Sequence, residues 1–175
     1  MLKIEIELNP TYHLTADAIG QPGKRVFYIQ GKNDETTITL LIEKLQLQSL
    51  VNGMMQFLTE IRKKFSNLAP ASGNYVEDSM HIPLPLDPLF RVGEMGLAYD
   101  TDRDLICLIL KEIVVPDMIP EDADTVRFWC SRDQILQLAN WGIEIISRGR
   151  PICPQCGEPM EPEGHFCPKK NGHKH

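Results

Sequence analysis

Residues 1–65 alternate between hydrophobic and polar positions before they change to a helical period. LKIEIEL places Ile4, Ile6 and Leu8 on one face, which is the two-residue period of a strand. YHLTADAIG, VFYIQG and TTITLLIE are also strand-like, and the turns QPGKR and KNDE separate them. Residues 44–64 then carry hydrophobic side chains at intervals of three and four, which predicts an amphipathic helix. Its apolar face consists of Leu47, Leu50, Val51, Met54, Phe57, Leu58 and Ile61.

Residues 89–150 repeat this order of strands followed by a helix. LFRVGEMGLAYD and LICLILKEIVV are strand-like, and TVRFWCSRDQILQLANWGIEIISRG begins as a strand and continues as a helix. Residues 125–140 align with residues 37–52 without a gap, so that the strand, the turn and the apolar phase of the helix agree. Ser131 and Gln134 form a capping box at the start of the second helix. We therefore predict an α+β fold with two pseudo-symmetric halves of antiparallel strands, each followed by one helix.

A segment of different composition joins the two halves. Residues 66–88 are rich in Pro, Ser and Asn, which is typical of a linker. This divides the chain into an α+β domain over residues 1–150, with halves 1–65 and 89–150, and a small tail over residues 151–175. A length of 175 residues suits one domain with an appendage.

Composition and charge restrict the class of protein. The chain is 42% hydrophobic and 24% charged, as is usual for globular proteins, and no apolar run approaches the ~18–20 residues that span a bilayer. The N-terminus lacks the apolar segment of a signal peptide, so we expect a cytoplasmic protein. The net charge is −6, and residues 76–150 hold seven basic and fourteen acidic side chains. This acidic middle disfavours a broad nucleic-acid surface there.

Three of the five cysteines lie in the tail, in a pattern typical of a zinc knuckle. Cys153 and Cys156 are separated by two residues in CPQCG, and Gly157 permits the positive φ of the turn that such a site needs. Cys167 supplies a third thiolate. Because Cys107 and Cys130 lie in apolar segments, we interpret them as buried free thiols in a reducing compartment, where the tail cysteines are metal ligands.

Two histidines compete for the fourth position of this site. His165 precedes Cys167 by two residues, and His173 follows it by six within reach of a loop. Three thiolates and one imidazole favour zinc over iron. A set of four protein ligands predicts a structural site, since catalytic zinc keeps an open position. The alternative is a metal-free or redox-active CxxC, but that motif opens a helix in thioredoxins and Gly157 and Pro159 disfavour one here.

The whole chain resembles an uncharacterised bacterial family, a domain of unknown function of about this length. The resemblance rests on GQPGKRVFY at residues 20–28, FRVG at residues 90–93, and the ending GRPICPQCG with GHFCPKKNG. It implies an intracellular bacterial protein that binds zinc, and it does not assign an activity to the chain. In this family H-x-C is the steadier feature, which favours His165 over His173 as the fourth ligand.

Basic residues suggest possible contacts with anions or nucleic acid. GQPGKR does not match a P-loop and is interpreted as a hairpin turn, although Arg25 could bind an anion. Basic residues also end both predicted helices, where the helix dipole favours them. The candidate contacts are Arg25, Arg62, Lys63, Lys64, Arg148 and Arg150, with Lys169 and Lys170 nearby in the tail.

Three functions follow from these patterns. The favoured hypothesis is a non-catalytic binding or adaptor protein with a structural zinc site and an unknown protein partner. The alternative is a single-stranded nucleic-acid-binding protein similar in architecture to Whirly and PUR proteins, with Tyr12, Phe27 and Tyr28 stacking on bases. An enzyme of unknown chemistry is third, because His13 and His81 fit no known catalytic spacing and no catalytic residue is identified.

Overall fold

The strands and helices occupy the segments that the hydrophobic pattern predicts. A computed structural model of the chain describes residues 2–149, 152–160, 165 and 167–170. In chain order its elements are β1 (Glu5–Leu8), β2 (His13–Ile19), β3 (Val26–Lys32), β4 (Thr37–Ile42), α1 (Lys44–Lys64), α2 (Glu77–Met80), β5 (Pro88–Asp100), β6 (Leu105–Glu112), a 3₁₀ turn (Pro120–Asp122), β7 (Thr125–Cys130), α3 (Arg132–Ser147) and a 3₁₀ turn (Pro168–Lys170).

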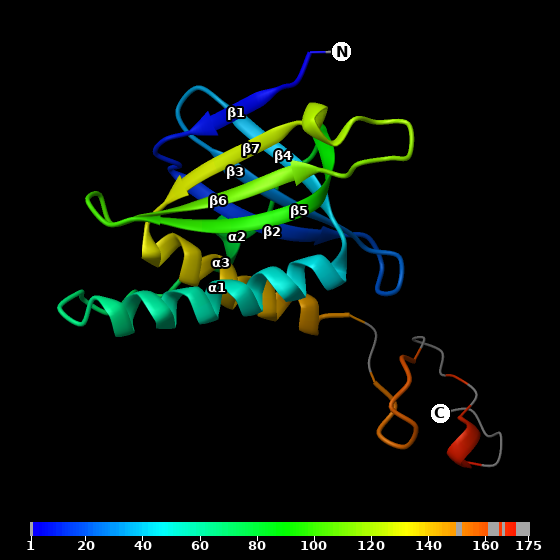
Figure 1. Cartoon of the computed structure of the whole chain (residues 1–175). Coiled ribbons are helices and arrows are strands. Elements are labelled where there is room, and N and C mark those ends of the chain that lie inside the picture. The colour runs from blue at the N-terminus through cyan, green and yellow to red at the C-terminus, as the bar shows by residue number, and fades with distance from the viewer. Residues whose placement is uncertain (1, 150–151, 161–164, 166, 171–175) are drawn as a thin grey trace.

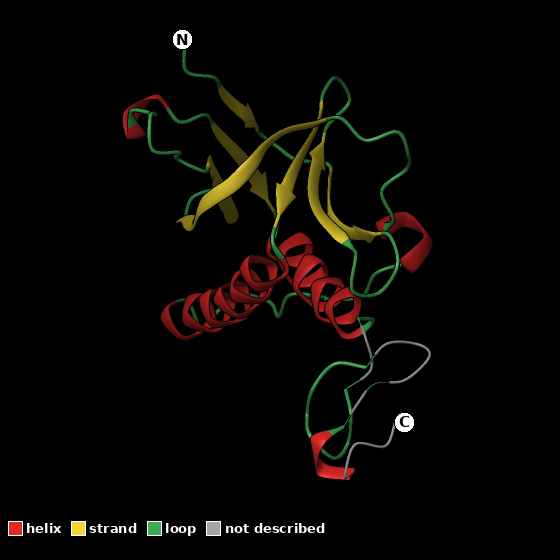
Figure 2. Ribbon diagram, turned by 90° about the vertical axis from the view of Figure 1, so that its right-hand side faces the viewer, coloured by secondary structure: helices red, strands yellow, loops and turns green. Residues whose placement is uncertain are grey.

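The described strands form one seven-stranded sheet with the order β1-β7-β6-β5-β4-β3-β2. Within it, β2, β3 and β4 make one antiparallel meander, and β5, β6 and β7 make a second. Helices α1 and α3 pack against each other beneath the sheet (Figures 1 and 2). The predicted α+β class and the helix that follows each set of strands are confirmed.

The sheet is mixed, whereas we expected antiparallel strands. β1 runs parallel to β7, and the first residues of β5 run parallel to β4. Each half therefore places a short segment beside the last strand of the other half. Strands joined by hairpins must be antiparallel, but strands from separate halves are free to run in the same direction. The alternation of hydrophobic and polar residues within a strand does not indicate either of these two pairings.

The two halves share a polar contact at the start of their helices. The Gln46 side chain accepts a hydrogen bond from the Glu43 N–H at 2.8 Å and donates to the Val92 carbonyl at 3.0 Å. Gln134 accepts from the N–H of the N-cap Ser131 at 2.8 Å and donates to the Thr11 carbonyl at 2.9 Å. In both cases one amide caps the helix and holds the segment that enters the other meander. The pseudo-symmetry thus extends to the side chains.

The core lies inside the curled sheet and between the sheet and the helices. The Phe128 ring crosses the interior to β3, where a Cβ at Gly31 would lie 2.5 Å from it. Trp141 of α3 is fully buried, and its Nε1–H donates to the Ala16 carbonyl at 2.6 Å. Other fully buried side chains are Leu8, Ile29, Leu40, Leu47, Met54, Ile106, Leu108, Leu110, Ile135 and Leu138.

The segment predicted as a linker, residues 66–88, packs closely against α3 and β2. The Ser72 N–H donates to the Asp133 carboxylate at 2.7 Å, and Tyr75 lies edge-on to Trp141 with ring centroids 5.6 Å apart. Met80, the last residue of α2, is buried. The segment is therefore part of the domain's packing and does not act as a free tether.

Two expectations from composition can be compared with the structure. No helix in the described part of the chain is long and apolar enough to cross a membrane. Cys107 and Cys130 are free and buried, as predicted. Burial raises the pKa of the Cys107 thiol to about 11 and that of Cys130 to about 12, so both remain protonated at neutral pH.

Candidate metal centre

A tight turn after α3 brings the first two tail cysteines together. Ile152 and Pro159 form an isolated antiparallel bridge, which closes the turn between them. The Cys153 N–H donates to the Glu158 carbonyl, and the Gly157 N–H donates to the Cys153 carbonyl, both at 2.9 Å. Gly157 has a φ of +77°, a conformation that glycine adopts without the strain of a Cβ. The sequence CPQCG thus folds into the turn that its spacing predicts.

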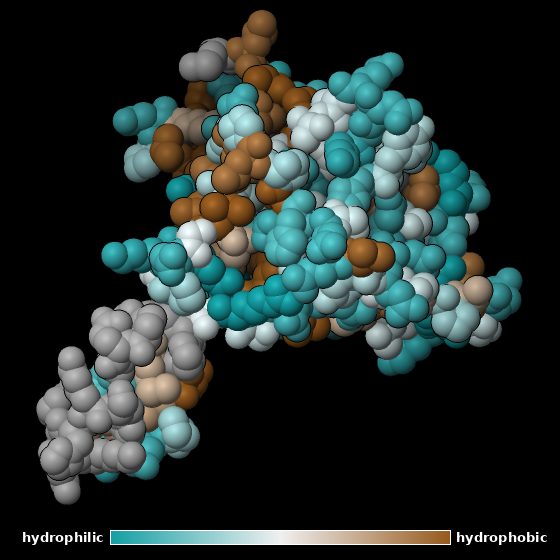
Figure 3. Space-filling view, turned by 180° about the vertical axis from the view of Figure 1, so that it is seen from behind, coloured by the Kyte–Doolittle hydropathy of each residue, from teal (hydrophilic) through white to brown (hydrophobic). Residues whose placement is uncertain are grey.

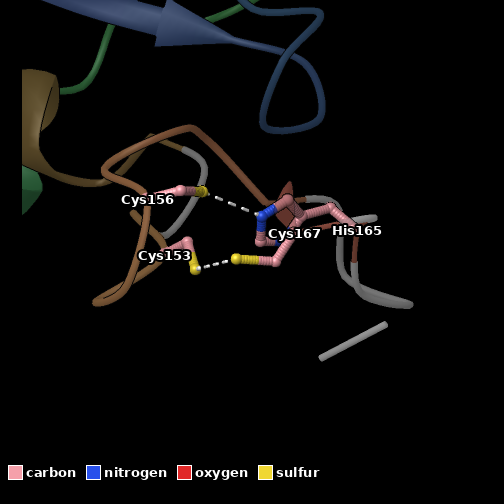
Figure 4. A group of neighbouring side chains, drawn as sticks. All are labelled: Cys153, Cys156, His165 and Cys167. Atoms are coloured by element: carbon pink, nitrogen blue, oxygen red, sulfur yellow. Dashed lines mark hydrogen bonds between the residues drawn. The ribbon is translucent and has the colours of Figure 1, made fainter. Parts of the chain in front are cut away.

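The second segment of the tail faces this turn and completes a four-residue cluster. The ligand atoms of Cys153, Cys156, His165 and Cys167 all lie within 4.8 Å of one another. The Sγ atoms of Cys153 and Cys167 are 3.8 Å apart, and the Cys156 Sγ lies 3.4 Å from the His165 Nε2 (Figure 4). Cys153 and Cys167 are buried. Four side chains from two segments therefore surround one point and could hold a metal ion.

The geometry and chemistry of this cluster fit a tetrahedral metal. Zn–S bonds of about 2.3 Å at a tetrahedral angle place two sulfurs about 3.8 Å apart, and a sulfur and an imidazole nitrogen slightly closer. The separations of 3.8 and 3.4 Å lie close to these values. Thiolate and imidazole donors suit zinc and other borderline or soft metals, and disfavour Mg²⁺ and Ca²⁺.

The two cysteines of the turn differ in acidity. Burial raises the pKa of the Cys153 thiol, but the N–H groups of Cys156 and Gln155 and the neighbouring thiols lower the pKa by more, so it lies below the usual value. At Cys156 the Glu158 N–H lowers the pKa, but burial and the other thiols raise it above the usual value. Negative charge on one thiolate thus opposes ionisation of the next, and a bound cation would relieve this repulsion.

Among the described residues, His165 is the fourth member of the cluster. His165 and Cys167 lie in the same short segment, and both side chains point toward the two cysteines of the turn (Figure 4). The alternative fourth ligand, His173, lies outside the described residues, as does His175.

The predicted basic contacts are distributed over separate surfaces. Arg62, Lys63 and Lys64 lie at the end of α1, a helix of 21 residues that spans roughly 30 Å. Arg25 lies near the opposite end of α1, where its guanidinium donates to the Ile145 carbonyl of α3. Among the tail lysines Lys169 is exposed, and Arg150 lies outside the described residues.

The three aromatic candidates for base stacking differ in exposure. Tyr12 is 59% exposed, whereas Phe27 is buried at 4% and Tyr28 is only half-buried. A ring must present a face to solvent to stack on a base. Of the three, Tyr12 meets this requirement best.

A polar network that the sequence does not reveal occupies the contact between the linker segment, β2 and α3. Buried Asp17 accepts a hydrogen bond from the Ile82 N–H at 2.9 Å, and its carboxylate lies 3.2 Å from the His81 Nδ1. The His81 Nε2 lies 3.3 Å from Glu77, and Glu77 pairs with Arg148 at 2.6 Å. The hydrogen bonds from Arg148 and His81 lower the pKa of Glu77 to about 2. Spacing could not indicate this network because Asp17, the Glu77–His81 pair and Arg148 are distant from one another in the sequence.

Comparison with known protein families identifies the family of this chain. Residues 7–167 match a family described as a protein of unknown function (DUF3090), and the chain belongs to this family. The match begins in β1 and ends at Cys167, so the α+β domain and all four residues of the cluster lie within one family unit. Neither a curated protein nor a solved structure matches the chain.

Proposed function

We propose that this DUF3090 protein binds one zinc ion through Cys153, Cys156, His165 and Cys167, and that the metal is structural. The observation that carries this proposal is the convergence of four ligand atoms from two tail segments within 4.8 Å. Four protein ligands fill a tetrahedron and leave no position for a substrate or a reactive water. When bound, zinc would supply a cross-link between the two segments and would take no part in a reaction.

Zinc explains how so short a tail can fold. In its described part the buried side chains are those of Cys153 and Cys167, both ligands, so that the tail has no apolar core of its own. Small units of this kind draw their folding free energy from the metal. Three thiolates and one imidazole favour zinc over iron.

We further propose that the protein is a binding or adaptor protein for an unidentified protein partner and does not catalyse a reaction. The closed ligand set supports the absence of catalysis at the metal, because it leaves no open position there for a substrate. The buried thiols and the ligand cysteines suit a reducing compartment such as the bacterial cytoplasm. For nucleic acid, the buried Phe27 ring and the pairing of Arg148 with Glu77 weaken two of the candidate contacts.

Elemental analysis of the purified full-length protein tests the metal proposal. We expect one zinc per chain, which the variants Cys156→Ser and His165→Ala lose under mild chelation. Cys107→Ala is the matched control, because it removes a buried thiol from β6 without touching the cluster. His173→Ala should retain the metal.

Three results would contradict the proposed zinc site. Absence of metal in the wild type would reject the site, and loss from His173→Ala would replace the fourth ligand. Zinc that persists in both histidine variants would indicate an open position and favour an enzyme.

A further inference from the structure

A cavity of about 400 Å³ lies where the turn between β2 and β3, the start of α1 and the tail meet. Its walls include Arg25 and Phe27 from the domain, and Ile152 and Pro159 from the tail. The last two residues form the bridge that closes the cysteine turn. We call this space the domain–tail cavity. Its volume falls within the range of small-molecule sites, about 300–1,000 Å³.

Three cationic side chains from three elements line the domain–tail cavity. Arg25 precedes β3, Lys44 is the first residue of α1, and Arg91 belongs to β5. The one acidic side chain in the lining, Glu43, pairs with Arg91. The cavity is therefore positive in a chain whose net charge is −6. A concave site lined by one sign of charge concentrates ions of the opposite sign.

Two of these cations approach the same backbone position. The Nζ of Lys44 and the Nη2 of Arg25 lie 3.0 and 3.3 Å from the point that a Cβ at Gly149 would occupy. In the described part of the chain neither side chain forms an ion pair with a carboxylate. Because both cationic atoms lie within 3.3 Å of one point, their positive charges repel each other, and an anion that contacts both would offset this repulsion.

The guanidinium of Arg25 is already held in position. Its Nη1 donates to the Ile145 carbonyl at 2.8 Å, and its Cζ lies 4.9 Å from the centre of the Phe27 ring. Burial lowers the pKa of Arg25, but an arginine remains charged at neutral pH. A fixed guanidinium loses little conformational freedom when it binds an oxyanion, which favours binding.

The remaining wall of the cavity is apolar. Val26, Phe27 and Ile42 line it from the domain, and Ile152 and Pro159 line it from the tail. Such a combination fits a ligand with an anionic group at one end and an apolar body at the other. We propose that the domain–tail cavity binds a small phosphate monoester, with the phosphate between Lys44 and Arg25 and the apolar body against Ile152 and Pro159.

The phosphate class follows from charge and geometry. A phosphate monoester is close to a dianion at neutral pH and presents three acceptor oxygens, which matches two converging cations with Arg91 beside them. The cavity also meets the N-terminal end of α1, but the carboxylate of the N-cap residue Glu43 lies there too, so the helix dipole adds little to the attraction. A carboxylate would bring one charge and two oxygens.

Isothermal titration of the full-length protein with phenyl phosphate tests the proposal, with inorganic phosphate and benzoate titrated in parallel. We expect phenyl phosphate to bind more tightly than either, because only it supplies both the phosphate and the apolar body. Lys44→Gln and Arg25→Gln should each weaken this binding about tenfold, since each removes a charge-assisted hydrogen bond. The matched control is Lys63→Gln, which makes the same charge change at the other end of α1 and should leave the affinity unchanged.

Three results would overturn the proposal. The first is no binding of phenyl phosphate at concentrations up to ~10 mM, which is weaker than any useful affinity. The second is an equal loss in Lys44→Gln and Lys63→Gln, which would indicate general charge attraction. The third is tighter binding of benzoate than of phenyl phosphate, which would identify a carboxylate site. Lys44 is exposed at the helix start, so its variant is expected to fold even if Arg25→Gln does not.

In the lining of the cavity, only Ile152 and Pro159 depend on the proposed zinc site. The cavity proposal and the zinc proposal can therefore fail separately. Zinc content measured in the same samples separates them. Chelation of zinc should weaken the binding of phenyl phosphate and leave the binding of inorganic phosphate unchanged, because the tail supplies only apolar contacts. If the wild-type protein is purified without zinc and its phenyl phosphate binding is still weakened by Lys44→Gln and not by Lys63→Gln, the cavity is upheld and the metal is rejected. A zinc-loaded protein that does not bind phenyl phosphate would do the reverse.

Discussion

The α+β domain and the tail differ in what stabilises each of them. The domain buries long apolar side chains from nearly every strand and both long helices, with Phe128 and Trp141 fully enclosed. In the described tail the buried side chains, Cys153 and Cys167, belong to the candidate metal cluster. The hydrophobic effect stabilises the first region, whereas the proposed zinc ion would stabilise the second. On this proposal the chain can lose the structure of one region and keep that of the other.

On the face seen in Figure 3, apolar side chains gather mainly at one end of the domain, polar side chains cover most of the rest, and the tail projects from the domain. The two regions meet at the domain–tail cavity, where Ile152 and Pro159 of the tail line the same space as Arg25 and Phe27 of the domain.

The largest expected effect comes from a substitution in the core of the domain, which should leave zinc binding by the tail unchanged. Phe128→Ala removes a ring that fills the interior above Gly31, and it should lower the free energy of unfolding by about 3–5 kcal/mol. Urea denaturation followed by circular dichroism measures this change. At low urea the variant should still bind one zinc per chain. Loss of zinc from the folded variant would show that the regions are coupled.

An intermediate effect tests the pseudo-symmetry inside the domain. Gln46→Ala and Gln134→Ala each remove a cap and a bond to the other half, so each should cost about 1–2 kcal/mol. The exposed Gln48 of α1 provides the control, since Gln48→Ala should be nearly neutral. Equal costs at Gln46 and Gln134 would support equivalent roles. A neutral result at either position would reject the equivalence.

The smallest effect concerns His81 and depends on pH. Burial lowers the pKa of His81, but its hydrogen bonds to Asp17 and Glu77 raise the pKa by more, and the net shift is upward. A raised folded-state pKa contributes stability that is complete below the ordinary value of about 6.5 and is lost as the pH rises through the raised value. We expect a loss of less than about 1 kcal/mol, because the side chain is 46% exposed.

Thermal unfolding between pH 6 and pH 8 measures this contribution in the wild type and in His81→Gln. The variant should lack the decline in stability with rising pH. His13 is the control, because burial and Lys32 lower its pKa and its contribution has the opposite sign. His13→Gln should therefore make the decline steeper. A decline that survives in His81→Gln would assign it to another group.

Much of the fold could be predicted from local sequence patterns. Alternation and the three- and four-residue periods located the strands and helices, and the S-x-x-Q pattern located the capping box at Ser131. The pairing of β1 with β7 and of β4 with β5 could not be predicted, because it joins segments far apart in the sequence. The close packing of residues 66–88 was also missed, since their composition is typical of a free linker.

The candidate sites divide in the same way. The three cysteines of the cluster lie close together in the sequence with ligand spacing, so that local pattern was sufficient to propose them, whereas the choice of His165 over His173 rested on the family resemblance. Asp17 and His81, or Lys44 and Arg91, are brought together only by the sheet and the helices. No spacing rule links such residues, and only the tertiary structure could associate them.

Amide hydrogen exchange with and without zinc tests the central claim, that a metal holds the tail and an apolar core holds the domain. The zinc-loaded protein should protect the Cys153 and Gly157 amides, which donate the two hydrogen bonds of the turn. After chelation these amides should exchange rapidly, whereas the amides of β6, in the middle of the domain's sheet, should remain protected. Equal protection of the turn in both states, or loss of protection in β6, would contradict the claim.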